Sequence, residues 1–231
     1  MKFTRLSLIA ALAVSAAVAG GDIEPAEVVV KPEVVAEESD FSISANLAIT
    51  SNYVWRGMTQ TKDSPALQGG VDLEYKGFYL GTWGSNVDFG DDDNSLEADF
   101  YAGYKGELAG IGFDAGIIQY AYPNASDEYN FKEVYLGISK DFELFGVSAK
   151  YSWGLDDMPD DWEVGASVNL PMEIGLEGTY GDYDTVGTYY TVVLTRSFGK
   201  FDLSVGYTDF SSDIDSALDE DHIIGSISTS F

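Results

Sequence analysis

The chain has 231 residues, no cysteine, and 39 acidic against 12 basic side chains, which give a formal net charge of −27. Such a surface repels phosphates, so the charge excludes nucleic acid as a partner, and the missing cysteines exclude a disulfide framework. The content of 15 tyrosines, 13 phenylalanines and 4 tryptophans is too aromatic for a disordered acidic chain. No pattern in the sequence indicates a cofactor.

The first residues have the three parts of a secretory signal peptide. A basic start, Met1 to Arg5, precedes an apolar run from Leu6 to Val18, and Ala17-Val18-Ala19 has the small-x-small form of a cleavage site. A buried helix and a short membrane anchor are alternatives, but the apolar run is shorter than the about 20 residues that span a bilayer. We therefore expect a signal peptide at residues 1–19, cleaved during export.

Residues 20–40 form an acidic stretch with two prolines and no periodicity, which we interpret as a flexible linker. From residue 41 to the C-terminus, segments of about ten residues alternate with turn signals, the length that a tilted membrane-spanning strand requires. The predicted strands are 41–53, 65–76, 77–88, 95–106, 110–122, 130–140, 145–154, 161–170, 172–182, 187–198, 200–210 and 221–231.

Several of these segments alternate apolar and polar residues, as in Trp162, Val164 and Ala166 against Glu163 and Gly165. In 77–88 and 187–198, either face could be the apolar one. Every second connection is short, and the connections between are long and acidic. Aromatic residues gather near strand ends, where the two membrane–water interfaces of a barrel would lie. A β-sandwich would need a second apolar face to cover the first. The sequence predicts an all-β fold at 41–231, a single antiparallel up-and-down transmembrane β-barrel of about 12 strands.

The last strand ends at the C-terminus on an aromatic residue, Phe231. A closing strand must be paired along its length, because hydrocarbon tolerates no open strand edge. This ending is typical of bacterial outer-membrane barrels, and we expect Phe231 to present the strand to the barrel-assembly machinery. The predicted location is the bacterial outer membrane.

Three segments carry a family resemblance: Thr50-Ser-Asn-Tyr-Val-Trp-Arg-Gly-Met-Thr-Gln-Thr61, Pro65-Ala-Leu-Gln-Gly-Gly-Val-Asp72 and Gly77 to Phe89. They resemble the opening of the TorF-type porins, the Gcw_chp proteins of unknown function. The resemblance implies an outer-membrane β-barrel and a pore. It implies no established substrate and no catalytic residue.

Residues opposite the apolar face would line the lumen, and most of them are acidic, which favours cations in a pore. The predicted lining consists of Gln68, Asp72, Glu74, Glu97, Asp99, Tyr101, Asp114, Glu133, Lys150, Glu163, Asn169, Glu177, Arg196 and Arg56. One hypothesis is a porin-like channel for small hydrophilic, cationic solutes. The alternative is a non-conducting structural or surface-binding barrel, in which the acids pair with Lys150 and Arg196 in a filled interior.

Arg56 is the base beside Tyr53 and Trp55 at the outer end of the first strand. It either folds inward, pairs with a lumen carboxylate such as Asp72 and narrows the mouth, or stays solvated with its stem on a ring. Ser51, Asn52 and Gln60 are candidates for the same hydrogen-bond network.

Acidic runs mark the outer connections at 91–93, 156–161 and 219–221. Adjacent carboxylates can bind a divalent cation weakly and so bridge to lipopolysaccharide, but charge runs more often remain solvated. His222 is the single histidine, and no motif marks a serine for it to activate, so the sequence predicts no catalysis and no metal centre.

Overall fold

The computed structural model describes residues 41–90, 94–125, 129–155 and 157–231. The predicted signal peptide and acidic linker lie outside these residues. Twelve strands of the described residues form one closed barrel in which each strand pairs with its neighbours in the series, and the first strand pairs with the last. The predicted fold class is confirmed.

The strand bounds agree with the predicted segments to within a few residues, except in the first outer connection, which contains two further short strands, β2 and β3. The elements are β1 (Phe41–Thr50), β2 (Val54–Trp55), β3 (Met58–Thr59), β4 (Ala66–Tyr75), β5 (Phe78–Asn86), β6 (Leu96–Leu108), β7 (Ile111–Ala121), β8 (Phe131–Asp141), β9 (Phe145–Gly154), β10 (Asp161–Leu170), β11 (Ile174–Tyr183), β12 (Gly187–Phe198), β13 (Phe201–Ser212), the 3₁₀ turn η2 (Ser216–Leu218) and β14 (Glu220–Ser230).

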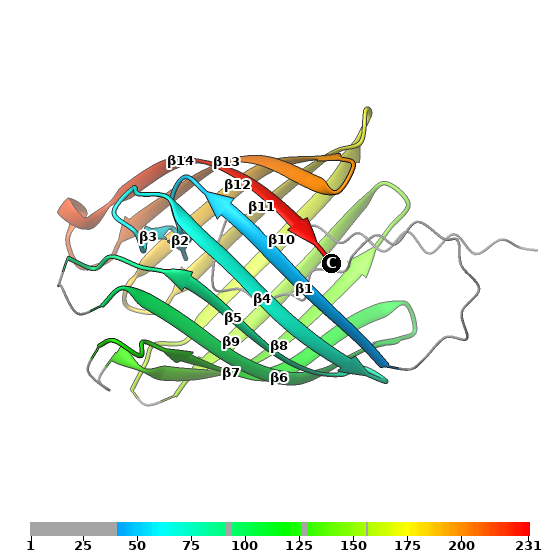
Figure 1. Ribbon diagram of the computed structural model, residues 1–231, viewed down its shortest axis with the longest axis horizontal. Coiled ribbons are helices and arrows are strands. Elements are labelled where there is room, and N and C mark those ends of the chain that lie inside the picture. Colours follow the sequence, from blue (N-terminus) through cyan, green and yellow to red (C-terminus); the bar gives the residue numbers. More distant parts are fainter. Residues whose placement is uncertain (1–40, 91–93, 126–128, 156) are drawn as a thin grey trace, which may run out of the picture.

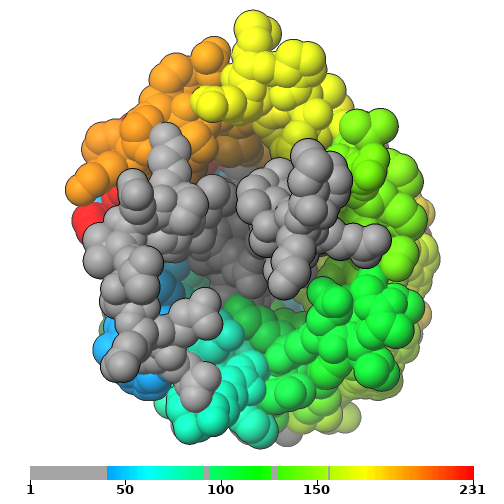
Figure 2. Space-filling view, turned by 90° about the vertical axis from the view of Figure 1, so that its right-hand side faces the viewer, coloured from blue at the N-terminus to red at the C-terminus, as the bar shows by residue number. Residues whose placement is uncertain are grey.

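The barrel closes where the two ends of the strand series meet. Viewed along the barrel, the chain colours follow one another around the ring (Figure 2). β1 and β14 pair antiparallel from Asn46↔Ser230 to Thr50↔Ser226. The backbone of Phe231 extends this pairing, because its N–H donates to Ala45 O at 2.9 Å and its carbonyl accepts from Ala45 N at 3.2 Å. The C-terminal residue therefore belongs to the closing seam.

The strands have an apolar outer face and a largely polar inner face. On β13, Leu203, Val205 and Tyr207 point outward and are exposed, while Ser204 and Thr208 point inward and are buried. The two strands whose facing the sequence left open follow the same rule, since Tyr79 and Tyr189 are buried on the inner side. An apolar exterior around a polar interior is the pattern of a membrane β-barrel and the reverse of the pattern in a water-soluble β-barrel.

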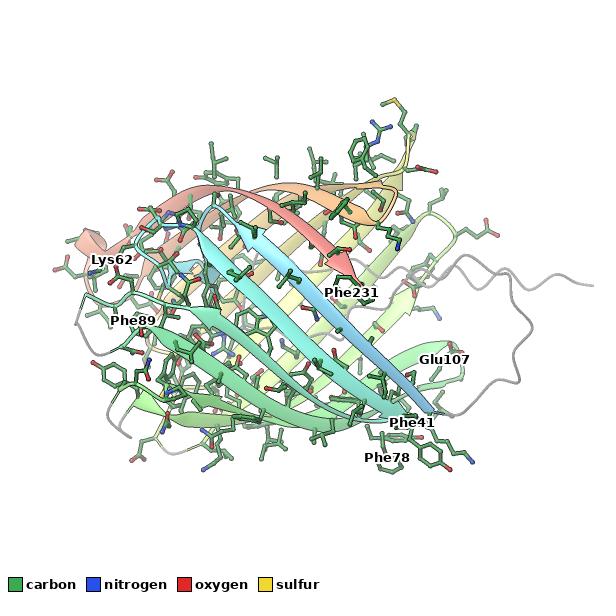
Figure 3. The ribbon with its side chains drawn as sticks, in the orientation of Figure 1. Phe41, Lys62, Phe78, Phe89, Glu107 and Phe231 are labelled. Atoms are coloured by element: carbon green, nitrogen blue, oxygen red, sulfur yellow. The ribbon has the colours of Figure 1, made fainter. Side chains whose placement is uncertain are left out.

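Connections are short at one end of the barrel, here called the turn end, and long at the other, the loop end (Figure 1). At the turn end, Lys76 and Gly77 have φ of 52° and 83°, so β4 and β5 are joined by a two-residue turn with both residues left-handed. Phe41, Phe78 and Glu107 lie at the turn end, and Lys62 and Phe89 at the loop end (Figure 3). No helix among the described residues is long and apolar enough to cross a membrane.

We predict that a charge placed at mid-height on the outer face destabilises the barrel. Val205, in the middle of β13, is 58% exposed. In lipid vesicles, Val205→Arg should lower the free energy of unfolding by about 2–4 kcal/mol, because arginine must enter hydrocarbon. Leu108→Arg, at the turn end, should cost at most about 1 kcal/mol. Equal losses in a denaturant titration would contradict the assignment of the outer face to lipid.

Candidate functional site

The connection between β1 and β4 turns into the lumen at the loop end. β1 ends at Thr50, which lies directly opposite Ala66 at the start of β4. Between them, Val54-Trp55 pairs with Met58-Thr59, and Gln60 N donates to Tyr53 O at 2.7 Å. We call residues 53–61 the lumen hairpin. Its β2 and β3 strands lie within the outline of the barrel (Figure 1).

The tip of the lumen hairpin is a two-residue turn with Arg56 in a left-handed conformation. Arg56 and Gly57 have φ of 47° and 82°, the pattern of a turn that usually has Asn or Gly at its first position. A left-handed arginine costs about 1–2 kcal/mol, and such strain persists where surrounding contacts outweigh it. Gly57 is required by space as well, because a Cβ there would lie 2.8 Å from Cβ of Phe210 and 2.9 Å from Cβ of Tyr189.

Arg56 binds two carboxylates on the far wall. Its Nη1 and Nη2 donate to the two oxygens of Glu133 at 2.8 and 2.9 Å, and its Nε lies 3.4 Å from Asp161 Oδ1. The guanidinium carbon is 4.3 Å from the ring centre of Trp55 and 4.7 Å from that of Tyr183. Burial opposes the charge, but the carboxylates of Glu133 and Asp161 outweigh it and raise the pKa of Arg56, so the group stays charged.

Other residues of the hairpin contact the remaining walls. Tyr53 Oη donates to Glu97 Oε1 on β6 at 2.9 Å, and the Trp55 ring lies 5.9 Å from the rings of Tyr120 and Phe131. On the opposite side, Val54 forms an apolar cluster with residues of β12 and β14. Since these contacts reach walls on opposite sides of a closed ring, the hairpin crosses the lumen at this level.

Polar contacts fix the base of the hairpin to the rim. Asn52 Oδ1 accepts hydrogen bonds from Thr59 Oγ1 at 2.7 Å and Thr61 Oγ1 at 2.9 Å. Thr59 N donates to Glu220 Oε2 at 2.8 Å. His222 lies between carboxylates, with Nδ1 2.8 Å from Asp63 and Nε2 2.9 Å from Glu220. β14 therefore holds the connection from the side of the seam.

Tyrosines and carboxylates form a second layer below the hairpin, toward the turn end. Tyr101 Oη donates to Asp72, and Tyr79 Oη contacts Asp114 Oδ1 at 2.6 Å and the hydroxyl of Tyr135. Tyr79 lies across β6 at Gly103, where a Cβ would approach its hydroxyl to 2.1 Å. Gly103 on β6 therefore makes room for the ring of Tyr79, which belongs to the neighbouring strand β5.

The predicted lining residues divide into three groups. Arg56, Glu97, Asp99 and Glu133 are fully buried at or beside the hairpin. Ion pairs join Lys150 to Glu163 at 3.2 Å and Lys105 to Glu74 at 2.9 Å, closer to open lumen. Inward positions are also held by Gln68, Asp72, Tyr101, Asp114, Asn169 and Glu177.

Two expectations about facing are wrong. Arg196 shares the outer face of β12 with Leu194 and Phe198, and its guanidinium lies 4.9 Å from the Phe198 ring, so its charge sits at the turn-end interface instead of the lumen. Of the two alternatives for Arg56, the structure shows the inward one, but the carboxylates it reaches are Glu133 on β8 and Asp161 on β10, while Asp72 binds Tyr101. Not every aromatic residue near a strand end faces the membrane–water interface as expected, since Tyr53, Tyr120, Tyr122 and Tyr189 are buried inside the barrel.

The outer acidic runs are only partly within the described residues, since Asp91–Asp93 and Asp156 lie outside them. Asp160 accepts hydrogen bonds from Gly154 N at 3.0 Å and Tyr151 Oη at 2.8 Å, and Asp219 accepts from Ser212 N at 2.8 Å. In the described ranges, no three acidic, histidine or cysteine side chains are grouped as a metal cluster. These acids order the loops that contain them.

We predict that neutralising one partner of the buried charge network loosens the barrel. Glu133→Gln leaves Arg56 without its bidentate partner in a buried site, so the free energy of unfolding should fall by about 3–5 kcal/mol. Asp88→Asn removes an exposed ion pair with Lys62 and should cost at most about 1 kcal/mol. Denaturant unfolding of both variants checks this, and equal small losses would show that Arg56 is not held as described.

Comparison with solved structures shows the same barrel at low sequence identity. The chain is similar to a KdgM porin (TM-score 0.58, 11% identity, covering 81% of this chain and 98% of that one). It is also similar to the NanC porin (TM-score 0.51, 11% identity, covering 82% of this chain and 99% of that one). A third similar structure is a Salmonella typhi outer membrane phospholipase dimer with bound calcium (TM-score 0.51, 10% identity, covering 81% of this chain and 90% of that one). No curated protein matches. A family model for a bacterial protein of unknown function matches residues 35–220, so the chain belongs to the Gcw_chp family.

Proposed function

We propose that this protein is an outer-membrane channel for the passive diffusion of small hydrophilic solutes, and that the lumen hairpin closes it in the present conformation. The barrel that it shares with porins supports the architecture, and the apolar exterior supports its placement in a membrane. The TorF-type porin character implied by the sequence resemblance forms part of this proposal, as does export by a cleaved signal peptide.

The channel proposal rests chiefly on one observation: a short connection that the wall does not need lies across the lumen at the loop end. Thr50 and Ala66 face each other across the β1–β4 ladder, so the wall is already complete below the hairpin. The hairpin itself is held by side-chain contacts, chiefly those of Arg56 and Tyr53. Contacts of this kind can be released without unpairing a barrel strand, which is what a gate requires.

Charge in the lumen supports a preference for cations. Arg56 is already paired with Glu133 and Asp161, and Lys150 and Lys105 each face a carboxylate. Asp72, Asp114 and Glu177 add further acidic groups on the inward faces. Carboxylates around a water-filled path attract cations and repel anions.

The second candidate is a non-conducting structural or surface-binding barrel. The depth at which the hairpin is buried favours it, since Tyr53, Val54 and Arg56 are each at most 2% exposed. In that case the hairpin stabilises the barrel permanently. The two candidates differ in whether removing the hairpin opens a path for ions.

Contacts with the surroundings belong to the same proposal. The outer face would contact membrane lipid, and the acidic loops would meet lipopolysaccharide. Phe231, paired in the closing seam, would present β14 to the barrel-assembly machinery. Catalysis is not proposed, because both ring nitrogens of His222 lie within 2.9 Å of carboxylates, which leaves neither directed at a serine.

We predict that removing the hairpin opens the barrel. In planar bilayers, wild-type protein should show low conductance, and a variant with residues 53–61 replaced by Gly-Gly should show a several-fold higher, stable conductance. A salt gradient should give a reversal potential of the cation-selective sign. A variant shortened at residues 213–218, in the loop before β14, serves as the control and should conduct like wild type.

Each result separates the candidates. High conductance with an anion-selective reversal potential would contradict the cation preference but would still agree with the channel proposal. A correctly folded hairpin variant that does not conduct would contradict the channel and favour the structural barrel.

A further inference from the structure

Two buried carboxylates without a basic partner among the described residues lie next to each other in the lumen wall. Glu97 and Asp99 are two residues apart on β6, so both point inward. They are 1% and 0% exposed. Their shared face and neighbouring positions bring the two carboxyl groups within reach of each other, so they repel when both are ionised and can share a hydrogen bond when one is protonated.

Aromatic residues and hydroxyls, instead of bases, surround this pair. The strand register puts Trp83 and Tyr120 beside Asp99. Tyr53 of the lumen hairpin donates to Glu97 from above, and Tyr122 also interacts with that carboxylate. Within the described ranges, neither Glu97 nor Asp99 forms an ion pair, and the nearby Arg56 is committed to Glu133 and Asp161.

When both groups are ionised, the pair has few hydrogen-bond donors around it. Glu97 Oε1 accepts the Tyr53 hydrogen bond, and the Tyr122 hydroxyl also interacts with the Glu97 carboxylate. Neither oxygen of Asp99 has a donor in the described part of the chain, and a hydrogen bond joins Asp99 to Glu97 only when one of the two carries a proton. A buried unpaired charge is costly, and two adjacent negative charges are costlier still. Something positive must therefore compensate the pair: a bound cation, or a proton.

We propose that Glu97 and Asp99 bind one hard divalent cation, Ca²⁺ or Mg²⁺, between them. The carboxylate oxygens of Glu97 and Asp99 and the hydroxyl oxygen of Tyr53 form an all-oxygen donor set, the type that these ions prefer. Two negative charges are balanced by one divalent ion, whereas a single shared proton leaves one charge uncompensated. This goes beyond the proposed channel function, because it assigns a ligand to the wall itself.

The site also joins the wall to the hairpin. Tyr53 reaches the pair from the hairpin, so a cation held by Glu97 and Asp99 would fix the position of Tyr53. Binding should stabilise the folded barrel, since a ligand that binds only the folded state adds to its stability. The effect is independent of whether the barrel conducts.

The test is cation uptake by the full-length mature protein in detergent, after treatment with a chelator. Titration with Ca²⁺ in a calorimeter should show one site per chain. Tb³⁺ should give luminescence sensitised by the adjacent tyrosines and Trp83. Asp99→Asn and Glu97→Gln should each weaken Ca²⁺ binding at least tenfold. Glu107→Gln should leave the affinity unchanged, because Glu107 lies on the same strand and face but is exposed at the turn end.

The outcomes are decisive in either direction. Folding of every variant is checked by its heat-modifiable mobility on gels. No uptake by folded wild-type protein would overturn the proposal. Uptake that is equal in wild type and in Asp99→Asn would place the cation elsewhere, for example at the acidic loops. Neither result bears on the conductance experiment, so failure of this proposal is distinguishable from failure of the channel.

Discussion

The buried charge of Arg56 is the interaction on which the interior of this barrel depends. A guanidinium taken out of water is costly, and it stays charged here because Glu133 binds it through both oxygens and Asp161 lies beside it. The network also outweighs a left-handed backbone at the tip of the hairpin. Since β8 and β10 supply the carboxylates while the arginine is attached between β1 and β4, the network exists only when the connection has folded inward across the lumen. Strands on the far side of the ring therefore fix the position of the connection.

The composition of the chain follows from a barrel wall that faces hydrocarbon on its outer side and a narrow, polar lumen on its inner side. Outer positions are aliphatic, as at Val205, because lipid offers no hydrogen-bond partner. Inner positions combine tyrosine with carboxylate. A tyrosine ring that lies flat against the wall needs a glycine at the position it covers on the neighbouring strand, as Tyr79 does at Gly103. High contents of tyrosine, glycine and acid are thus three consequences of one packing scheme. The same scheme brings Glu97 and Asp99 together without a base between them.

Much of the wall could be predicted from sequence, because period-two alternation and the contrast between short turns and long connections are local signals. The lumen hairpin could not, because Val54-Trp55 and Met58-Thr59 are too short to show a period, although Arg56-Gly57 between them is a turn signal. Alternation also cannot show whether an aromatic residue at a strand end faces lipid or lumen, as Tyr120 illustrates. It misassigned Arg196 for a related reason: a long base near an interface can lie on the outer face with its charge in the headgroups. Which carboxylates Arg56 reaches depends on contacts across the ring, distant in sequence.

The connection between β1 and β4 lies in the lumen and is held there by Arg56. The reactivity of a single introduced thiol reports this position, since the chain has no cysteine of its own. Val54→Cys should react slowly with a charged, water-soluble thiosulfonate in folded protein, because Val54 is 1% exposed, and at least tenfold faster when Glu133→Gln is added. Lys62→Cys, at the exposed rim, should react quickly in both backgrounds. Rapid modification of Val54→Cys in the otherwise wild-type barrel would show that the hairpin is not held inside the lumen.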